Sequence, residues 1–311
     1  MSDRDANKKS WDSADWDAFA SKKNINSNST ASTIYKSTYG KAWLLPHNFK
    51  NGIRESRDSD QFPKSTPIVM GVDETGSMST VLATVMKRID ETMKELYERK
   101  PVTDPQICFM AFGDAICDTT PIQVTQFETD IRIAEQLGDI YFEKCGGGNG
   151  GESYMLPWYI ASRKCKTDSW DKRQKKGFIF TVGDECCHPT LTKAQIKRFI
   201  GDDVEADITA EELLSEVSRK WEVYHLIVDP VAYQNVARNW HKLLGKNAIV
   251  LEDVDKIPEI IISILELHAG KDVDTIIKSW DGSKQLVVKN AIKDLADSGS
   301  YTGDSNIVEF N

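Results

Sequence analysis

The chain has 311 residues, of which 40% are hydrophobic and 28% charged, and a formal net charge of −9 at pH 7. This length is enough for one large domain with additions or for two small domains, with a sizeable core. The acidic balance argues against a general nucleic-acid-binding protein, although the basic run DKRQKKG at residues 171–177 is open to interpretation as a local basic patch or as a solvated loop.

No stretch approaches the roughly 18 consecutive apolar residues of a membrane span, and the first residues, MSDRDANKKSWDSADWD, lack the apolar centre of a secretory signal. The six cysteines contain no C-x-x-C pair. Scattered cysteines without a secretory signal favour reduced thiols, so we expect a cytoplasmic protein.

Residues 1–65 are predicted to form a polar N-terminal extension that is partly wrapped on the core. The run SKKNINSNSTASTIYKSTYG at residues 21–40 is too polar to build a core alone. Apolar residues that are interspersed in the extension are predicted to anchor it: Trp11, Trp16, Phe19, Trp43, Leu44 and Leu45.

Residues 66–268 show the alternation of a folded α/β domain. Apolar runs predict strands at 66–73, 106–114, 121–127, 175–185, 222–230 and 247–253. Helical spacing predicts helices at 79–100, 130–144, 154–165, 190–200, 209–221 and 256–270. Residues 269–311 are predicted to be a helical extension, with Leu286, Val287, Ala291, Ile292 and Leu295 packed inward, and a loose tail.

This order of elements favours a doubly wound, mostly parallel sheet with helices on both faces and one antiparallel edge strand. In such sheets, ligands bind beyond the carboxyl ends of the strands. Three loops expected at such ends carry unusual chemistry: DETGS at 73–77, GGGNGGES at 146–153 and GDE at 183–185.

The first loop sets Asp73, Thr75 and Ser77 at alternating positions of a tight turn, and Asp184 ends a neighbouring strand. One or two carboxylates with several neutral oxygens suit Mg²⁺, which prefers octahedral oxygen coordination and keeps some water. The alternative for the three residues of the first loop is helix N-capping, for which Ser, Thr and Asp are equally suited.

The stretch VDETGSMS resembles the metal-ion-dependent adhesion site (MIDAS) of von Willebrand factor A (vWA) domains, whose first element reads Asp-x-Ser/Thr-x-Ser. GGGNGGES and VGDECCHP resemble further motifs of the vWA subclass with a Gly-Gly-Gly-Asp-x-Pro-Glu loop. The resemblance covers roughly residues 66 to 268 and implies a Rossmann-like vWA fold.

By this resemblance, Asp73, Thr75 and Ser77 would be metal ligands, and Asp184 would act through water. The sequence departs from the family at Gly148, where the family usually has Thr, and at Asn149, where the subclass has Asp. Either Asn149 or Ser153 is then expected to supply the missing oxygen, and Gly148 and Glu185 to contact the partner. Glu152 matches the subclass Glu and is predicted to be structural.

Other candidate residues have simpler interpretations. Cys186, Cys187 and His188 are adjacent, and adjacent side chains rarely bind one zinc ion. Asp114 and Asp118 are predicted to belong to a hairpin turn rather than to the site. His225 is predicted to be a core histidine, and the tryptophans are predicted to be core or packing residues: Trp158, Trp170, Trp221 and Trp240.

These observations favour a binding module rather than an enzyme. Mg²⁺ or Mn²⁺ would complete its coordination with an acidic residue of a partner protein, and the resemblance implies multiprotein assemblies, some with AAA+ ATPases. A phosphohydrolase of the haloacid-dehalogenase type is the first alternative, but it needs a second acid where this chain has Thr75. The second alternative is a structural subunit with a vestigial metal loop.

Overall fold

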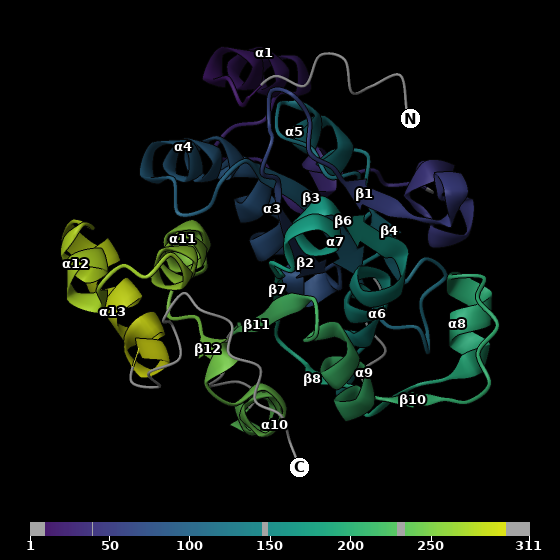
Figure 1. Ribbon diagram of the computed structural model, residues 1–311. Helices are drawn as coiled ribbons and strands as arrows, with labels where there is room; N and C mark the ends of the chain where they lie inside the picture. Colours follow the sequence, from purple (N-terminus) through teal and green to yellow (C-terminus); the bar gives the residue numbers. More distant parts are fainter. Residues whose placement is uncertain (1–9, 39, 145–148, 229–233, 297–311) are drawn as a thin grey trace.

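The computed structural model describes residues 10–38, 40–144, 149–228 and 234–296. Within these ranges, a six-stranded sheet has the order β12-β11-β7-β2-β3-β4 (Figure 1). The strands are β2 (Thr66–Asp73), β3 (Pro105–Phe112), β4 (Ile122–Val124), β7 (Gly177–Gly183), β11 (Trp221–Ile227) and β12 (Ala248–Val250). Neighbouring strands run parallel except β3 and β4, so the predicted α/β class with one antiparallel edge strand is confirmed.

Strand residues alternate between two hydrophobic clusters, one on each face of the sheet. In β2, Ile68, Met70 and Val72 belong to one cluster and Val69 to the other. The first face is covered by α1 (Ser13–Lys23), α2 (Ala31–Ile34), α3 (Ser79–Lys87), α4 (Ile89–Arg99), α5 (Arg132–Leu137), α11 (Ile257–His268), α12 (Val273–Lys278) and α13 (Gly282–Ala296). The second is covered by α6 (Met155–Tyr159), α8 (Lys193–Phe199), α9 (Ala210–Val217) and α10 (Gln234–Leu244). Helices on both faces, as predicted, exclude water from both sides of the central strands.

Several predicted elements differ from the observed ones. The helix predicted over 79–100 is interrupted at Arg88, which has φ −99° and ψ 7° and separates α3 from α4. The strand predicted at 121–127 is shorter in the structure, where β4 has three residues, all of them buried. Leu286 is 60% exposed, so the prediction that it packs inward is wrong, whereas Ala291, Ile292 and Leu295 are buried as predicted.

Helix α10 was not predicted at all. Its segment carries Val236 and Trp240 one turn apart, and both side chains are buried against the second face. The surrounding polar residues, Gln234, Asn235, Arg238 and Asn239, obscure this short apolar stripe in the sequence. Packing against the sheet nevertheless stabilises the helix.

The N-terminal extension contacts the core through apolar anchors. Trp11, Trp16, Phe19 and Leu44 are buried, and Trp43 is half-buried against the first cluster. The backbone of Lys36 also forms a parallel bridge with Tyr141. The division of the chain at residues 65 and 268 stays a prediction.

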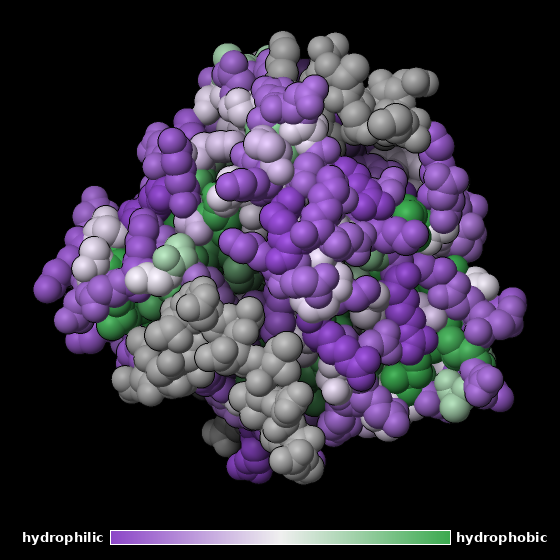
Figure 2. Space-filling model, viewed as in Figure 1, coloured by the Kyte–Doolittle hydropathy of each residue, from purple (hydrophilic) through white to green (hydrophobic). Residues whose placement is uncertain are grey.

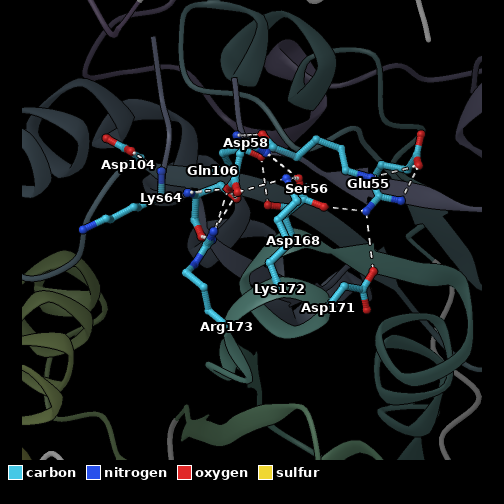
Figure 3. A network of polar contacts seen from close by, with 12 residues as sticks. Glu55, Ser56, Asp58, Lys64, Asp104, Gln106, Asp168, Asp171, Lys172 and Arg173 are labelled. Carbon is cyan, nitrogen blue, oxygen red and sulfur yellow. Dashed lines mark hydrogen bonds and ion pairs between the residues drawn. The ribbon is translucent and has the colours of Figure 1, made fainter. Parts of the chain in front are cut away.

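A second, small parallel pair joins β1 (Arg54–Ser56) of the extension to β6 (Cys165–Thr167), which leads into α7 (Asp168–Arg173). Figure 3 shows the ionic network at this place. Arg173 contacts both carboxylate oxygens of Asp58, at 2.6 and 3.1 Å, and Arg57 Nη1 lies 2.7 Å from Asp168 Oδ1. The network, which we call the amino-edge clasp (Arg57, Asp58, Asp168, Lys172, Arg173), fastens the segments that enter β2 and β7.

The four minor elements are β5 (Gly151–Glu152), which pairs with β8 (Cys186–Cys187), and β9 (Thr190–Leu191), which pairs with β10 (Ile208–Thr209). Because β5 lies within the glycine loop and β8 follows the turn after β7, the first pair holds two of the predicted site loops together. No helix in the described part of the chain has the length and apolar character needed to cross a membrane.

Asp58→Asn should lower the free energy of unfolding by about 1–3 kcal/mol at pH 7, because the amide loses charge-assisted hydrogen bonds. Partial burial opposes ionisation, but hydrogen bonds from Arg173 and Ser65 hold the pKa of Asp58 below its ordinary value. A lowered folded-state pKa stabilises the protein above about pH 4, and this stabilisation is lost as the pH falls further.

Denaturant unfolding at pH 7 and pH 3 checks this prediction, with Asp60→Asn as the matched control because Asp60 is exposed. The difference between Asp58→Asn and the unsubstituted chain should shrink at pH 3. A difference of the same size at both pH values would contradict the role of the Asp58 charge.

Candidate functional site

The register of the sheet brings the predicted first and third loops to one edge. Asp73, the last residue of β2, pairs with Phe112 on β3, and Val72 pairs with Val182 on β7. Asp184 is the first residue after β7, and neighbouring strands of a sheet lie about 4.8 Å apart. Asp184 therefore begins its loop directly beside Asp73. The chain leaves β2 toward β3 and leaves β7 toward β11, in opposite directions along the sheet, so this is the switch point at which ligands of doubly wound sheets bind.

The loop after β2 is a tight turn built around the Asp73 carboxylate. Asp73 is fully buried, and its Oδ1 accepts a hydrogen bond of 2.8 Å from the backbone N–H of Thr75. The hydroxyl oxygens of Thr75 and Ser77 lie 3.3 Å apart. The structure thus brings the two hydroxyls together beside the carboxylate, as the alternation of the three residues predicts.

Tyr154 connects this turn to the loop after β7. Its hydroxyl lies 3.4 Å from Asp73 Oδ2 and accepts a hydrogen bond of 3.3 Å from the backbone N–H of Glu185. A Cβ atom on Gly183 would lie only 1.9 Å from the Tyr154 hydroxyl, so the approach requires glycine at this position. Sequence reasoning missed Tyr154, because a tyrosine at the start of a predicted helix is an ordinary core residue.

The ring of Tyr154 is fixed by three aromatic neighbours. It makes edge contacts with Phe112, His225 and Trp240, at centroid distances of 4.8, 5.0 and 4.8 Å. His225 stacks on Trp240 and lies 2.9 Å from the Thr181 hydroxyl, and burial keeps the pKa of His225 well below its ordinary value. The predictions of a core histidine and of a core Trp240 are confirmed, and together they form the floor of the site. Trp158 and Trp221 are buried as well, whereas Trp170 is half-buried.

Asp114 joins the glycine loop to the loop after β7. Its fully buried carboxylate accepts hydrogen bonds from Asn149 Nδ2 at 2.6 Å and from the Ile116 N–H at 3.0 Å, and it lies 2.9 Å from His188 Nε2. Burial raises the pKa of Asp114, but the hydrogen bond from His188 and those from Ile116 and Asn149 outweigh it and bring the value to about 2. The hairpin predicted around Asp114 and Asp118 is present, but Asp114 also organises the site, which sequence reasoning missed.

The predicted ligands of the glycine loop contact Asp114 instead of the first turn. Besides the Asn149 contact, the Ser153 hydroxyl accepts a hydrogen bond of 2.9 Å from the Ala115 N–H and lies 3.5 Å from Asp114 Oδ1. Their role as metal ligands stays a prediction. Gly148 lies outside the described residues, and Glu185 is half-buried beside Asp184.

Buried carboxylates concentrate at this edge of the sheet. Burial and, more weakly, the charge of Asp184 raise the pKa of Asp73 to about 7. Burial and the charges of Asp73 and Asp114 raise the pKa of Glu152 to about 10, and Glu152 Oε2 is buried without a hydrogen-bond partner among the described residues. Buried acids that repel one another fit a bound cation, which would lower the cost of ionising them.

The composition of the donors decides what kind of cation fits. In the described ranges, no three Asp, Glu, Cys or His side chains are grouped as ligands of a metal ion. The absence of zinc at Cys186, Cys187 and His188 stays a prediction. A site made of two hydroxyls and few carboxylates is instead the chemistry of Mg²⁺ or Mn²⁺ with retained water.

The basic run at 171–177 lies at the opposite edge and is largely paired. Lys172 and Arg173 contact Asp58, and Lys176 lies 3.0 Å from Glu222. This pairing agrees with a solvated, locally neutralised loop rather than a patch for nucleic acid.

No protein-family model and no curated protein matches the chain. Solved structures with a similar course of the chain include the pilus adhesin SpaC from Lactobacillus rhamnosus GG, which is 14% identical over 72% of this chain and 31% of its own, with a TM-score of 0.43. Proximal thread matrix protein 1 from the mussel byssus is 11% identical over 65% and 48% of the two chains, with a TM-score of 0.42. A von Willebrand factor type A protein from Catenulispora acidiphila is 14% identical over 68% and 44%, with a TM-score of 0.38. The match spans less than half of each of these chains, and similarity at this level carries no information about what the present chain binds.

Gly183→Ala should destabilise the protein by at least about 2 kcal/mol, because the new methyl group displaces the Tyr154 hydroxyl from between the two loops. Gly138→Ala is the control, since its Cβ would meet no atom closer than 3.4 Å. Equilibrium denaturation of both variants checks the prediction, and equal effects would contradict the close approach of Tyr154 to Gly183.

Proposed function

We propose that the chain is a binding module that holds Mg²⁺ or Mn²⁺ at the carboxyl edge of its sheet and uses the ion to engage an acidic residue of a partner protein. The observation that carries the proposal is the convergence of Asp73, the paired hydroxyls of Thr75 and Ser77, and Asp184 at the switch point of the sheet.

Thr75 and Ser77 would hold the ion through their hydroxyls, Asp73 through its carboxylate, and Asp184 through water. Asn149 or Ser153 would add an oxygen if the ion draws it away from Asp114. Such a donor set neutralises a divalent cation only in part, so the ion retains attraction for a carboxylate from outside. A partner carboxylate would then complete the coordination, with Gly148 and Glu185 beside it.

The enzyme alternative is less well supported by the geometry. A phosphohydrolase of the haloacid-dehalogenase type would place a proton donor at residue 75, where the chain has Thr75 with its hydroxyl against Ser77. Asp73, which would be the nucleophile, is fully buried and receives hydrogen bonds at both oxygens. Both features suit a fixed ligand better than an attacking group.

A partner that presents an acidic residue need not be acidic overall. The chain itself carries a net charge of −9, so long-range attraction would favour partners with basic surroundings around the engaged acid. We place the module in a multiprotein assembly in the cytoplasm, and an AAA+ ATPase is one candidate partner.

Millimolar Mg²⁺ should raise the melting temperature of the chain, because an ion that binds only the folded state stabilises it by mass action. The gain is about 2.7 kcal/mol at a hundredfold excess over the dissociation constant. Asp73→Ala should abolish the shift, and Asp60→Ala, which removes an exposed acid elsewhere, should keep it. An absent shift in the unsubstituted chain would favour the vestigial-loop alternative.

Capture of partner proteins from native lysate should depend on the divalent cation and on Asp73. EDTA should release the captured protein, and Asp73→Ala should fail to bind it while keeping an unchanged circular dichroism spectrum. Capture by Asp73→Ala in EDTA equal to capture by the unsubstituted chain with Mg²⁺ would refute the proposal. Sustained hydrolysis of a phosphoester with Mg²⁺ that is lost in Asp73→Asn would instead establish the enzyme.

A further inference from the structure

A cavity of about 180 Å³ lies between the N-terminal extension, the β3–β4 loop and α8, at the edge of the sheet next to β4. Leu45, Ile122 and Phe199 contribute its apolar wall, and His47 and Arg198 stand among its lining residues. An apolar cavity of roughly 150 Å³ is large enough for a benzene molecule, so this one accommodates an aromatic ring or a branched aliphatic group.

The residues that line the cavity include apolar side chains and one arginine, Arg198, that has no ion-pair partner among the described residues. The guanidinium of Arg198 lies 4.7 Å from the centre of the Phe199 ring, and it makes no ion pair with any residue in the described ranges. Its neighbour Lys197, by contrast, lies 2.6 Å from Asp203. In a chain with nine more acids than bases, an unpaired arginine beside an apolar cavity is suited to a ligand carboxylate.

One acid, Glu143, contacts two residues that line the cavity, Thr119 and Thr120. Glu143 accepts hydrogen bonds from the backbone N–H groups of Thr119 and Thr120, at 3.0 and 2.9 Å, and it contacts the Thr119 hydroxyl. These bonds fix the Glu143 carboxylate on the β3–β4 loop. In the described ranges no ion pair joins Arg198 to Glu143, so the Arg198 donors are available to a ligand, with the His47 imidazole as a second group.

We propose that this cavity binds a carboxylate carried on an aromatic or branched apolar group. The apolar group fills the space against Leu45, Ile122 and Phe199, and the carboxylate pairs with Arg198. The carboxylate belongs either to a free small acid or to the C-terminal residue of a partner chain, because both present the same chemistry. This site is separate from the proposed cation site, and no metal ion takes part in it.

Binding of benzoate, measured by saturation-transfer NMR and titration calorimetry in EDTA, tests the proposal. Benzoate should bind at least tenfold more tightly than benzamide, its neutral counterpart, and Arg198→Gln should remove this preference. Lys193→Gln, which removes a charge of the same sign from the same helix, should leave binding unchanged, and so should Asp73→Ala. Binding that is lost in Asp73→Ala but kept in Arg198→Gln would place the carboxylate at the cation site and overturn the proposal.

Two peptides distinguish the sources of the carboxylate. If a chain terminus is the ligand, acetyl-Gly-Phe with a free carboxylate should bind at least tenfold more tightly than benzoate, and its amidated form should not bind. If a small acid is the ligand, benzoate should bind at least as tightly as the peptide. An absence of binding by both at millimolar concentration, with Arg198→Gln indistinguishable from the unsubstituted chain, would refute the site.

Discussion

The hydroxyl of Tyr154 is the contact on which the carboxyl edge of the sheet depends. It lies between Asp73 at the end of β2 and the backbone of Glu185 after β7, and it comes from the segment that follows the glycine loop. One atom therefore contacts two of the site loops and belongs to the residue that directly follows the third. Because it is buried and its ring is packed on three sides, the loops share one arrangement instead of moving independently.

The acidic side chains at the two edges of the sheet have opposite surroundings. At the amino edge, the carboxylates of the clasp have arginine and lysine partners within 3.3 Å, as Figure 3 shows for Asp58 and Asp168. At the carboxyl edge, in the described part of the chain, Glu74 and Glu152 each keep a buried oxygen without a hydrogen-bond partner. Burial, together with the charges of Asp118 and Asp73, raises the pKa of Glu74 well above its ordinary value. Burying an acid without a side-chain cation costs free energy unless a proton or an external cation accompanies it, and this cost is what supports the proposal of an ion at the carboxyl edge.

How far the sequence predicts this site depends on the range of the interactions. The apolar runs predict β2, β3, β7 and β11, and the alternation of Asp73, Thr75 and Ser77 predicts a converging turn, because both depend on neighbours in the chain. Tyr154 and Asp114 are different. Tyr154 contacts Asp73, which is 81 positions away in the chain, and Asp114 contacts His188, which is 74 positions away. No local sequence pattern marks residues of this kind. The break at Arg88 has the same origin, since its guanidinium reaches Glu259 on α11.

The face of the molecule drawn in Figure 2 is mostly hydrophilic, with hydrophobic side chains in small groups, one of them near α8. Among the described residues, Ile116, Val250 and Leu286 are the large hydrophobic side chains that are exposed. Three such side chains are too few to form a broad apolar interface, and some exposed hydrophobic residues are common on protein surfaces. A partner would then gain its specificity from polar and charged contacts.

The hydrogen bonds of Asp73 also bear on how strongly an ion held there would attract a partner. Its Oδ1 accepts from the Thr75 N–H and its Oδ2 faces the Tyr154 hydroxyl, so both oxygens already share their negative charge with donors. Each carboxylate oxygen has about two acceptor positions, so capacity for an ion remains, but less charge is left to neutralise it. Thr75 and Ser77 contribute no charge at all. A divalent cation in such surroundings keeps most of its positive charge, and a carboxylate from another protein is the ligand that best neutralises it.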